Sequence, residues 1–460
     1  MENFWVYSVW GSFNLIAVLL ASLLAANMLK RSVSWLQASL IPTSVLGGGM
    51  LLVLVGLYRL ITGEDLFETP FFGGNGTANL ELLTYHTLAL GFIASAFKSS
   101  GGKLSKQRTV EIFNTGVTTV ATYLLQAIFG LGITVVAALV MKDFFPAAGI
   151  LLPFGYGQGT GQALNYGNIF ETDYGFSGGK SFGLTIAALG FLSASIGGVI
   201  HLNLLRRRGK IAQQKKGEEA LRSEQIQSAN EIPMQESIDK MTIQIALIAV
   251  AYLLAYLLMY ALGSLLPGMR SVIYGFNFLL GVLSGTVVKM VIDRLHKANI
   301  IHREYTNDFL MTRASNFFFD LMVVSGIAAI RLSALEQYWG IMLILGIVGL
   351  VITYVYNYYI AQKLFPAYRE EQFLTMYGML TGTASTGIIL LREIDGEFKT
   401  PAADNMVYQN FPAIVFGFPL MFLATLAPRQ PMLTFGILVV FFAVMNLILF
   451  RGSLFGKKQA

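Results

Sequence analysis

The sequence predicts an all-α polytopic membrane protein. Hydrophobic residues make up 55% of its 460 residues, and charged residues make up 13%, where about 25% is usual in soluble domains. A membrane-crossing helix needs about 20 mostly apolar residues, and nearly uncharged runs of that length recur along the chain. We expect eleven spans, at residues 9–29, 40–61, 80–97, 113–141, 180–205, 241–266, 271–292, 315–336, 340–361, 405–427 and 432–450.

Composition also excludes several classes of chemistry. The chain contains no cysteine, which rules out disulfides, cysteine-ligated zinc, iron–sulfur clusters and thiol catalysis. Its four histidines are scattered, and no H-E-x-x-H or G-x-x-x-x-G-K-[ST] motif occurs, which argues against an enzyme and against an ATP-driven pump. The net charge of +6 requires no nucleic-acid partner, because cytoplasmic loops of membrane proteins concentrate Lys and Arg.

The distribution of basic residues predicts the orientation. With the N-terminus outside, the inner loops hold most of the Lys and Arg residues. The outer side then keeps only Lys142, Lys180, Arg270, Arg331 and Arg429. The positive-inside rule therefore favours an outer N-terminus and a cytoplasmic C-terminus.

A charged segment at residues 206–240 divides the chain near its middle and is typical of a solvated cytoplasmic linker. We expect a first repeat at residues 1–205 and a second at 241–427, each with five spans. Because five is odd, the second repeat enters the membrane from the opposite side, which predicts an inverted repeat. Residues 428–460 hold an extra C-terminal span and a cytoplasmic tail.

Two apolar stretches, at about 144–166 and 373–391, are too rich in Gly, Thr, Ser and Gln for ordinary lipid-facing helices. Both carry the pattern G-x-x-x-G-T, at residues 155–160 and 378–383. We expect each to form a re-entrant hairpin, one from each side, so that the tips meet near mid-membrane. The alternative is that the small residues only allow close helix packing.

The residues at these expected tips indicate a binding site. Backbone carbonyls and hydroxyls freed at a helix break are hard oxygen ligands for an alkali cation, while exposed helix N-termini favour a carboxylate. The candidate substrate-binding residues are Gly157, Gln158, Gly159, Thr160, Gly161, Thr381, Gly382, Thr383, Ser385 and Thr386.

The candidate ligands of this cation are Thr160, Thr383, Asn165 and Asp320. Asp320 is included because a carboxylate inside a span is costly to bury and is a functional candidate by default. The alternative for Asp320 is a structural pair with a neighbour such as Arg313.

These residues resemble the bacterial sodium/glutamate symporter family. Residues 153–176, from Pro153-Phe154-Gly155 to the Tyr174-Gly175-Phe176 triplet, are similar to its first signature, a G-G-H-G-T-G hairpin followed by Y-G-F. The resemblance covers most of residues 30–205 and, more faintly, 270–425. It implies a symporter of the bacterial inner membrane that couples inward sodium movement to uptake of glutamate. It also implies two re-entrant loops, a homodimer and an elevator-like transport domain.

The chain departs from the family pattern in three places. Gln158 stands where the signature has histidine, Ser385 stands where the second signature has proline, and the eleventh span exceeds the usual ten. On the resemblance, Thr160, Thr383, Ser385 and Thr386 would hold the substrate carboxylate or sodium, and Gln158 would meet a polar part of the substrate. A different small carboxylate or amino acid, or an ion channel, remains an alternative.

Overall fold

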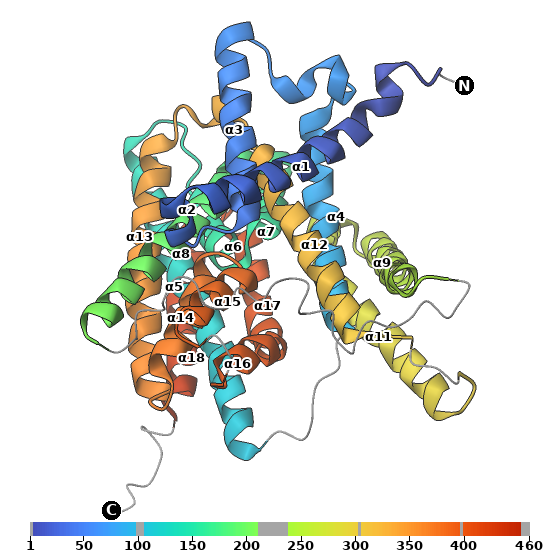
Figure 1. Ribbon diagram of the computed structural model, residues 1–460. Coiled ribbons are helices and arrows are strands. Elements are labelled where there is room, and N and C mark those ends of the chain that lie inside the picture. The colour runs from blue at the N-terminus through green and yellow to red at the C-terminus, as the bar shows by residue number, and fades with distance from the viewer. Residues whose placement is uncertain (1–2, 98–104, 210–237, 302–304, 396–398, 452–460) are drawn as a thin grey trace, which may run out of the picture. The chain divides into compact units, whose positions relative to one another are not determined.

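The computed structural model describes residues 3–97, 105–209, 238–301, 305–395 and 399–451, and these are α-helical with short 3₁₀ turns and no strand (Figure 1). The chain forms two compact units. Unit 1 comprises residues 1–88, 100–199 and 319–460, and unit 2 comprises residues 89–99 and 200–318. Helices α4 (Gly76–Ala96), α8 (Gly179–Arg207) and α12 (Asp308–Ala328) run from one unit into the other.

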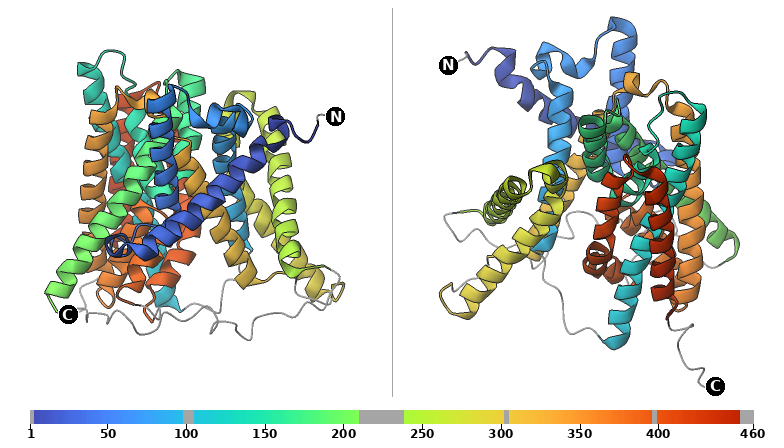
Figure 2. Two further views of the ribbon diagram at one scale, coloured as in Figure 1. Left: turned by 45° about the horizontal axis from the view of Figure 1, so that its top comes forward. Right: turned by 180° about the vertical axis from the view of Figure 1, so that it is seen from behind.

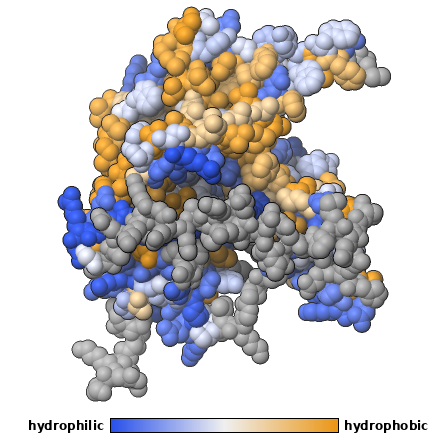
Figure 3. All heavy atoms as spheres, viewed as in Figure 1, coloured by the Kyte–Doolittle hydropathy of each residue, from blue (hydrophilic) through white to orange (hydrophobic). Residues whose placement is uncertain are grey.

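Seven helices in the described residues are long and apolar enough to cross a membrane, or nine if two bent pairs each form one span. The seven lie in α1 (Tyr7–Ser32), α3 (Thr43–Thr62), α5 (Lys106–Val140), α8, α9 (Lys240–Leu265), α13 (Trp339–Leu364) and α18 (Pro431–Leu449). Much of the surface in Figure 3 is hydrophobic, and Leu253, Leu257 and Tyr260 of α9 are exposed. Apolar side chains so placed suit contact with lipid.

Two predicted spans are bent. The first bend, of 73°, lies between residues 267–275, which end with α10 (Arg270–Gly275), and residues 277–297, which form α11 (Asn277–Lys297). Residues 402–408, which form α16 (Ala402–Tyr408), meet residues 412–426 of α17 (Asn410–Leu426) at 52°. Predicted spans 80–97 and 315–336 correspond to α4 and α12, which are helices of 21 residues and are not among the seven.

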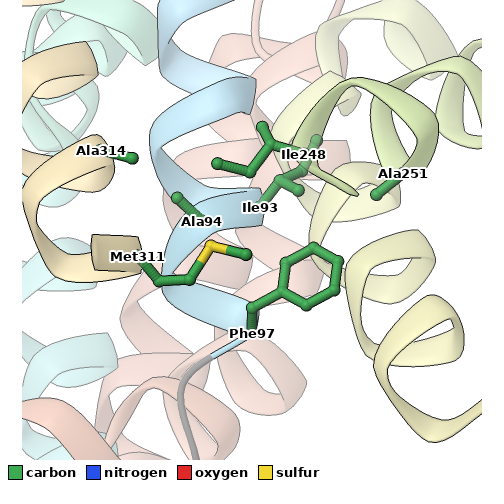
Figure 4. Packing of buried hydrophobic residues seen from close by; sticks show 7 residues of the cluster. All are labelled: Ile93, Ala94, Phe97, Ile248, Ala251, Met311 and Ala314. Atoms are coloured by element: carbon green, nitrogen blue, oxygen red, sulfur yellow. The ribbon is translucent and has the colours of Figure 1, made fainter. Parts of the chain in front are cut away.

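Unit 2 packs around the inner-facing residues of three helices. Ile93, Ala94 and Phe97 of α4 meet Ile248 and Ala251 of α9 and Met311 and Ala314 of α12 (Figure 4). A hydrogen bond of 2.8 Å between the Ser95 and Ser315 hydroxyls joins α4 to α12. Asp239 caps α9 by accepting hydrogen bonds from the amides of Met241 and Thr242.

Unit 1 is organised by the long helix α5, which lies beside α13 and α18 (Figure 2). Its buried face carries polar residues at helical spacing, namely Thr115, Thr118, Thr119, Thr122, Gln126 and Thr134. The remaining helices of the unit are α2 (Ser34–Ala38), α6 (Leu151–Gln158), α7 (Thr160–Tyr174), α14 (Arg369–Thr381) and α15 (Ala384–Arg392). The predicted linker at 206–240 lies mostly outside the described residues, which resume at residue 238.

Candidate functional site

Helices α6 and α7 form the first of two helix–break–helix hairpins, called hairpin 1 (residues 151–174). The break is at Gly159, whose φ of +83° and ψ of −173° are accessible in practice only to glycine. The rings of Phe154 and Tyr166 stack with centroids 3.9 Å apart, which brings the two legs together. The second leg continues to Tyr174 rather than ending near residue 166, and Gly175 in the left-handed region then ends it.

Helices α14 and α15 form hairpin 2 (residues 369–392). The chain leaves helical geometry at Gly382 and Thr383, between the two legs. The legs approach closely through glycine, because a Cβ placed on Gly378 would lie 2.8 Å from the Cα of Gly387. Hairpin 2 matches the predicted stretch 373–391 closely.

The tips of the two hairpins lie against each other within unit 1. A Cβ placed on Gly159 would lie 3.7 Å from Cγ2 of Thr383 and 3.8 Å from the carbonyl oxygen of Gly382. Helices α7 and α15 begin at this meeting point, while α6 and α14 end there. The site therefore combines two N-termini, which favour anionic groups, with two C-termini, which favour cations.

Helix α5 holds both tips. The Tyr123 hydroxyl donates to the carbonyl oxygen of Gly157 at 3.1 Å. The Gln126 Nε2 donates to the carbonyl oxygen of Leu380 and to Oγ1 of Thr353, each at 2.9 Å. These side chains satisfy backbone carbonyls that a broken helix would leave without partners.

Helix α8 holds the legs of both hairpins. Ser193 bonds to the Tyr156 hydroxyl of hairpin 1 at 2.8 Å through its side chain, and it accepts from the Tyr377 hydroxyl of hairpin 2 at 2.7 Å through its carbonyl. Gly190 allows a close contact with hairpin 2, because a Cβ there would lie 2.5 Å from the carbonyl oxygen of Thr381.

Two buried oxygen atoms at the tips, Oγ1 of Thr160 and Oε1 of Gln126, have no hydrogen-bond partner among the described residues. Thr160 is fully buried, and its Cβ would lie 3.0 Å from a Cβ placed on Gly326 of α12. Next to Gly326 in the chain, the Ser325 hydroxyl bonds to that of Thr84 on α4 at 2.9 Å. Since an unsatisfied buried polar atom is costly, these oxygens are suited to receive a ligand.

The other predicted residues divide between the site and its surroundings. Gln158 and Thr383 are partly exposed at the tips, Ser385 is exposed, and Thr386 is buried with its hydroxyl 3.4 Å from that of Thr383. The Thr381 hydroxyl is already used in a 2.6 Å bond to the carbonyl of Tyr377. Gly157 and Gly161 lie within helices α6 and α7 on either side of the break.

The two remaining sodium candidates lie away from the break. Asn165 is one turn further along α7, and its Nδ2 donates to Oε1 of Gln162 at 3.3 Å. Asp320 is an exposed residue of α12, six residues before Gly326, and its carboxylate hydrogen-bonds Ser44 of α3. Six residues correspond to about 9 Å along a helix.

Sequence reasoning missed Tyr123 and Gln126, because both lie inside the apolar run 113–141. The available signal was the polar row on α5, in which Thr115, Thr119, Thr122 and Gln126 recur every three or four residues. A polar stripe on a membrane-length helix indicates a face turned toward protein rather than lipid.

Paired broken-helix hairpins in a multi-pass helical protein are typical of secondary membrane transporters. The family model for the sodium/glutamate symporter matches residues 11–370. The chain therefore belongs to the sodium/glutamate symporter family, which is a family of transporters and not of enzymes, and the resemblance drawn from its sequence is confirmed. The match ends at the start of hairpin 2. A search of curated proteins gave no match.

Proposed function

We propose that the protein imports glutamate, or a closely related anionic amino acid, together with sodium, and that the joined hairpin tips form the binding site. The observation that carries this proposal is a pair of buried oxygens without partners among the described residues: Thr160 Oγ1 at the start of α7, and Gln126 Oε1 beside Gly157 near the end of α6. Hydroxyl and amide oxygens are hard ligands suited to an alkali cation, and the first turn of α7 suits a carboxylate.

Transport follows from alternating access to this site. Both hairpins are re-entrant, they enter from opposite sides as parts of an inverted repeat, and the tips separate substrate from each side in turn. Sodium and substrate share the binding free energy, so neither partly loaded form crosses readily. A homodimer in the bacterial inner membrane with an elevator-like moving domain, an outer N-terminus and a cytoplasmic C-terminus completes the proposal.

The test is uptake of labelled L-glutamate by proteoliposomes that hold the purified protein, with inward sodium, potassium or proton gradients in separate runs. We expect saturable accumulation with the sodium gradient only. Sodium-dependent accumulation of a different amino acid or carboxylate in place of glutamate would retain the mechanism and correct the substrate, and Gln158 would be the first residue to exchange for histidine. Flux that no cation gradient changes would refute coupling.

A further inference from the structure

A second group of buried polar residues lies between α5, α14 and α16 in unit 1. Asn405 and Gln409 are 0% and 2% exposed. They are one turn apart, since the amide of Gln409 donates to the carbonyl of Asn405 at 2.9 Å. Their side chains therefore lie on one face. Oδ1 of Asn405 and Oε1 of Gln409 are both buried, and neither has a hydrogen-bond partner in the part of the chain that the structure describes.

The orientation of the Asn405 amide is fixed by a directional chain of hydrogen bonds. The Thr115 hydroxyl donates to the carbonyl oxygen of Glu111 at 2.8 Å, so its oxygen accepts from Nε2 of Gln372 at 3.1 Å. The Gln372 Oε1 consequently faces Asn405 and accepts from its Nδ2 at 3.1 Å. Reversing the Asn405 amide would bring two oxygens together.

A second chain fixes the same amide from the other side. The Tyr368 hydroxyl donates to Oε2 of Glu111 at 2.8 Å and accepts from Nδ2 of Asn405 at 2.9 Å. Burial and the hydrogen bond to Glu111 raise the pKa of Tyr368 well above its usual value, so this hydroxyl keeps its proton. The Asn405 amide nitrogen thus donates two hydrogen bonds, while its oxygen accepts none from the described residues.

The Gln409 amide is oriented in the same sense. Its Nε2 donates to Oδ1 of Asn410 at 3.1 Å and contacts Sδ of Met379 at 3.5 Å. Two amide groups on one face of α16 and its C-terminal end thus direct their N–H groups to protein partners and leave their oxygens unpaired. An occupant of this position must offer positive charge or hydrogen-bond donors.

We propose that Asn405 Oδ1 and Gln409 Oε1 are ligands of a sodium ion bound beside the first leg of hairpin 2. Neutral amide oxygens are hard ligands suited to an alkali cation. In the part of the chain that the structure describes, no group of three or more His, Cys, Asp or Glu residues could hold a metal, which favours a monovalent ion. Glu111 supports the site indirectly, because it accepts a hydrogen bond from the Tyr368 hydroxyl, which in turn accepts one from Asn405.

The proposal deepens the proposed function, on which it rests for the identity of the ion. Because Gln372 and Met379 belong to α14, sodium at this position joins α16 to hairpin 2. We therefore expect sodium to bind and stabilise the protein before substrate arrives.

The test is thermal unfolding of the full-length purified protein in increasing NaCl, without substrate, with choline chloride holding ionic strength constant. Sodium should raise Tm in the wild type. Gln409→Leu should raise the half-saturating sodium concentration about tenfold or more, because mutating even the residues that support a metal ligand lowers metal affinity by about tenfold or more. Gln409→Glu keeps an oxygen and adds a charge, so it should lower that concentration. The matched control is Thr434→Val, which removes a buried unpartnered hydroxyl from α18.

The control lies far from the site. A Cβ placed on Gly132 of α5 would lie 3.4 Å from Cε2 of Phe435, the next residue after Thr434. Gly132 is 17 residues, about 25 Å of helix, from Thr115. The proposal would be overturned if Gln409→Leu responded to sodium as the wild type does, because the position would then hold only water. If Gln409→Leu does not fold, Gln409→Glu provides the same comparison. A wild type that sodium does not stabilise would also overturn the proposal. Loss of glutamate uptake with the sodium responses intact would refute the substrate alone.

Discussion

Gln126 places an amide between the two hairpin tips. Its Nε2 bonds the Leu380 carbonyl of hairpin 2, and its Oε1 would lie 3.3 Å from a Cβ placed on Gly157 of hairpin 1. Glycine and threonine patterns predicted Thr160 and Thr383 at the tips, because a helix break requires particular backbone conformations. Those patterns could not predict Gln126, whose role depends on how α5 packs against segments distant in the sequence.

Replacing Gln126 should impair both stability and coupling. Gln126→Leu leaves the Leu380 carbonyl buried without this donor, which costs about 1–3 kcal/mol, and it removes one of the two unpartnered oxygens. We expect a lower Tm and a higher sodium concentration for half-maximal uptake. Gln362→Leu on α13 is the control, because the buried unpartnered atom of Gln362 is a nitrogen donor. Equal behaviour of the two variants would contradict the role of Gln126.

At the scale of elements, hairpin 1 depends on the backbone conformation at Gly159, and hairpin 2 depends on the break at Gly382 and Thr383. Both predicted stretches contain a helix break, although hairpin 1 spans residues 151–174 rather than about 144–166. The bends in the other spans were not predicted. The bend before α17 had a local signal in Pro412, which has no N–H to donate to the preceding turn. The bend after α10 lacks a proline, and we find no comparable signal in its sequence.

Gly159→Ala should destabilise the protein by about 1–3 kcal/mol, the cost of forcing an L-residue into this region of backbone space. Gly436→Ala on α18 has nothing within 4 Å of the added Cβ. Alanine is favoured over glycine in a helix by about 1 kcal/mol, so this control should raise Tm. Thermal unfolding measures whether Tm falls in Gly159→Ala and rises in Gly436→Ala. A stability of Gly159→Ala equal to that of the wild type would show that the tip adopts another conformation.

For the whole molecule, composition alone predicts the class of protein, because the low charge and the apolar runs leave a polytopic membrane fold as the solution. It predicts less about individual spans, since α4 and α12 carry polar and charged residues such as Glu81 and Asp320. Residues like these depend on neighbouring helices for their environment, and hydropathy along one segment does not report that environment.

The predicted orientation can be tested because the natural chain has no cysteine. Asn75 and Lys297 are both exposed and lie in loops predicted on opposite sides. In intact cells, a membrane-impermeant maleimide should label Asn75→Cys and should label Lys297→Cys only after the membrane is opened. The positive-inside rule is the physical basis of this expectation. Labelling in the reverse pattern would show that the topology is the inverse of the predicted one.

The central claim is that the joined hairpin tips bind the sodium that drives uptake. Its most direct test is the sodium dependence of glutamate accumulation by proteoliposomes holding wild type, Thr160→Val or Thr434→Val. Loss of an oxygen ligand worth about 1.4 kcal/mol should raise the half-maximal sodium concentration about tenfold in Thr160→Val, while Thr434→Val should match the wild type. A Thr160→Val protein with the sodium dependence of the wild type would contradict the claim.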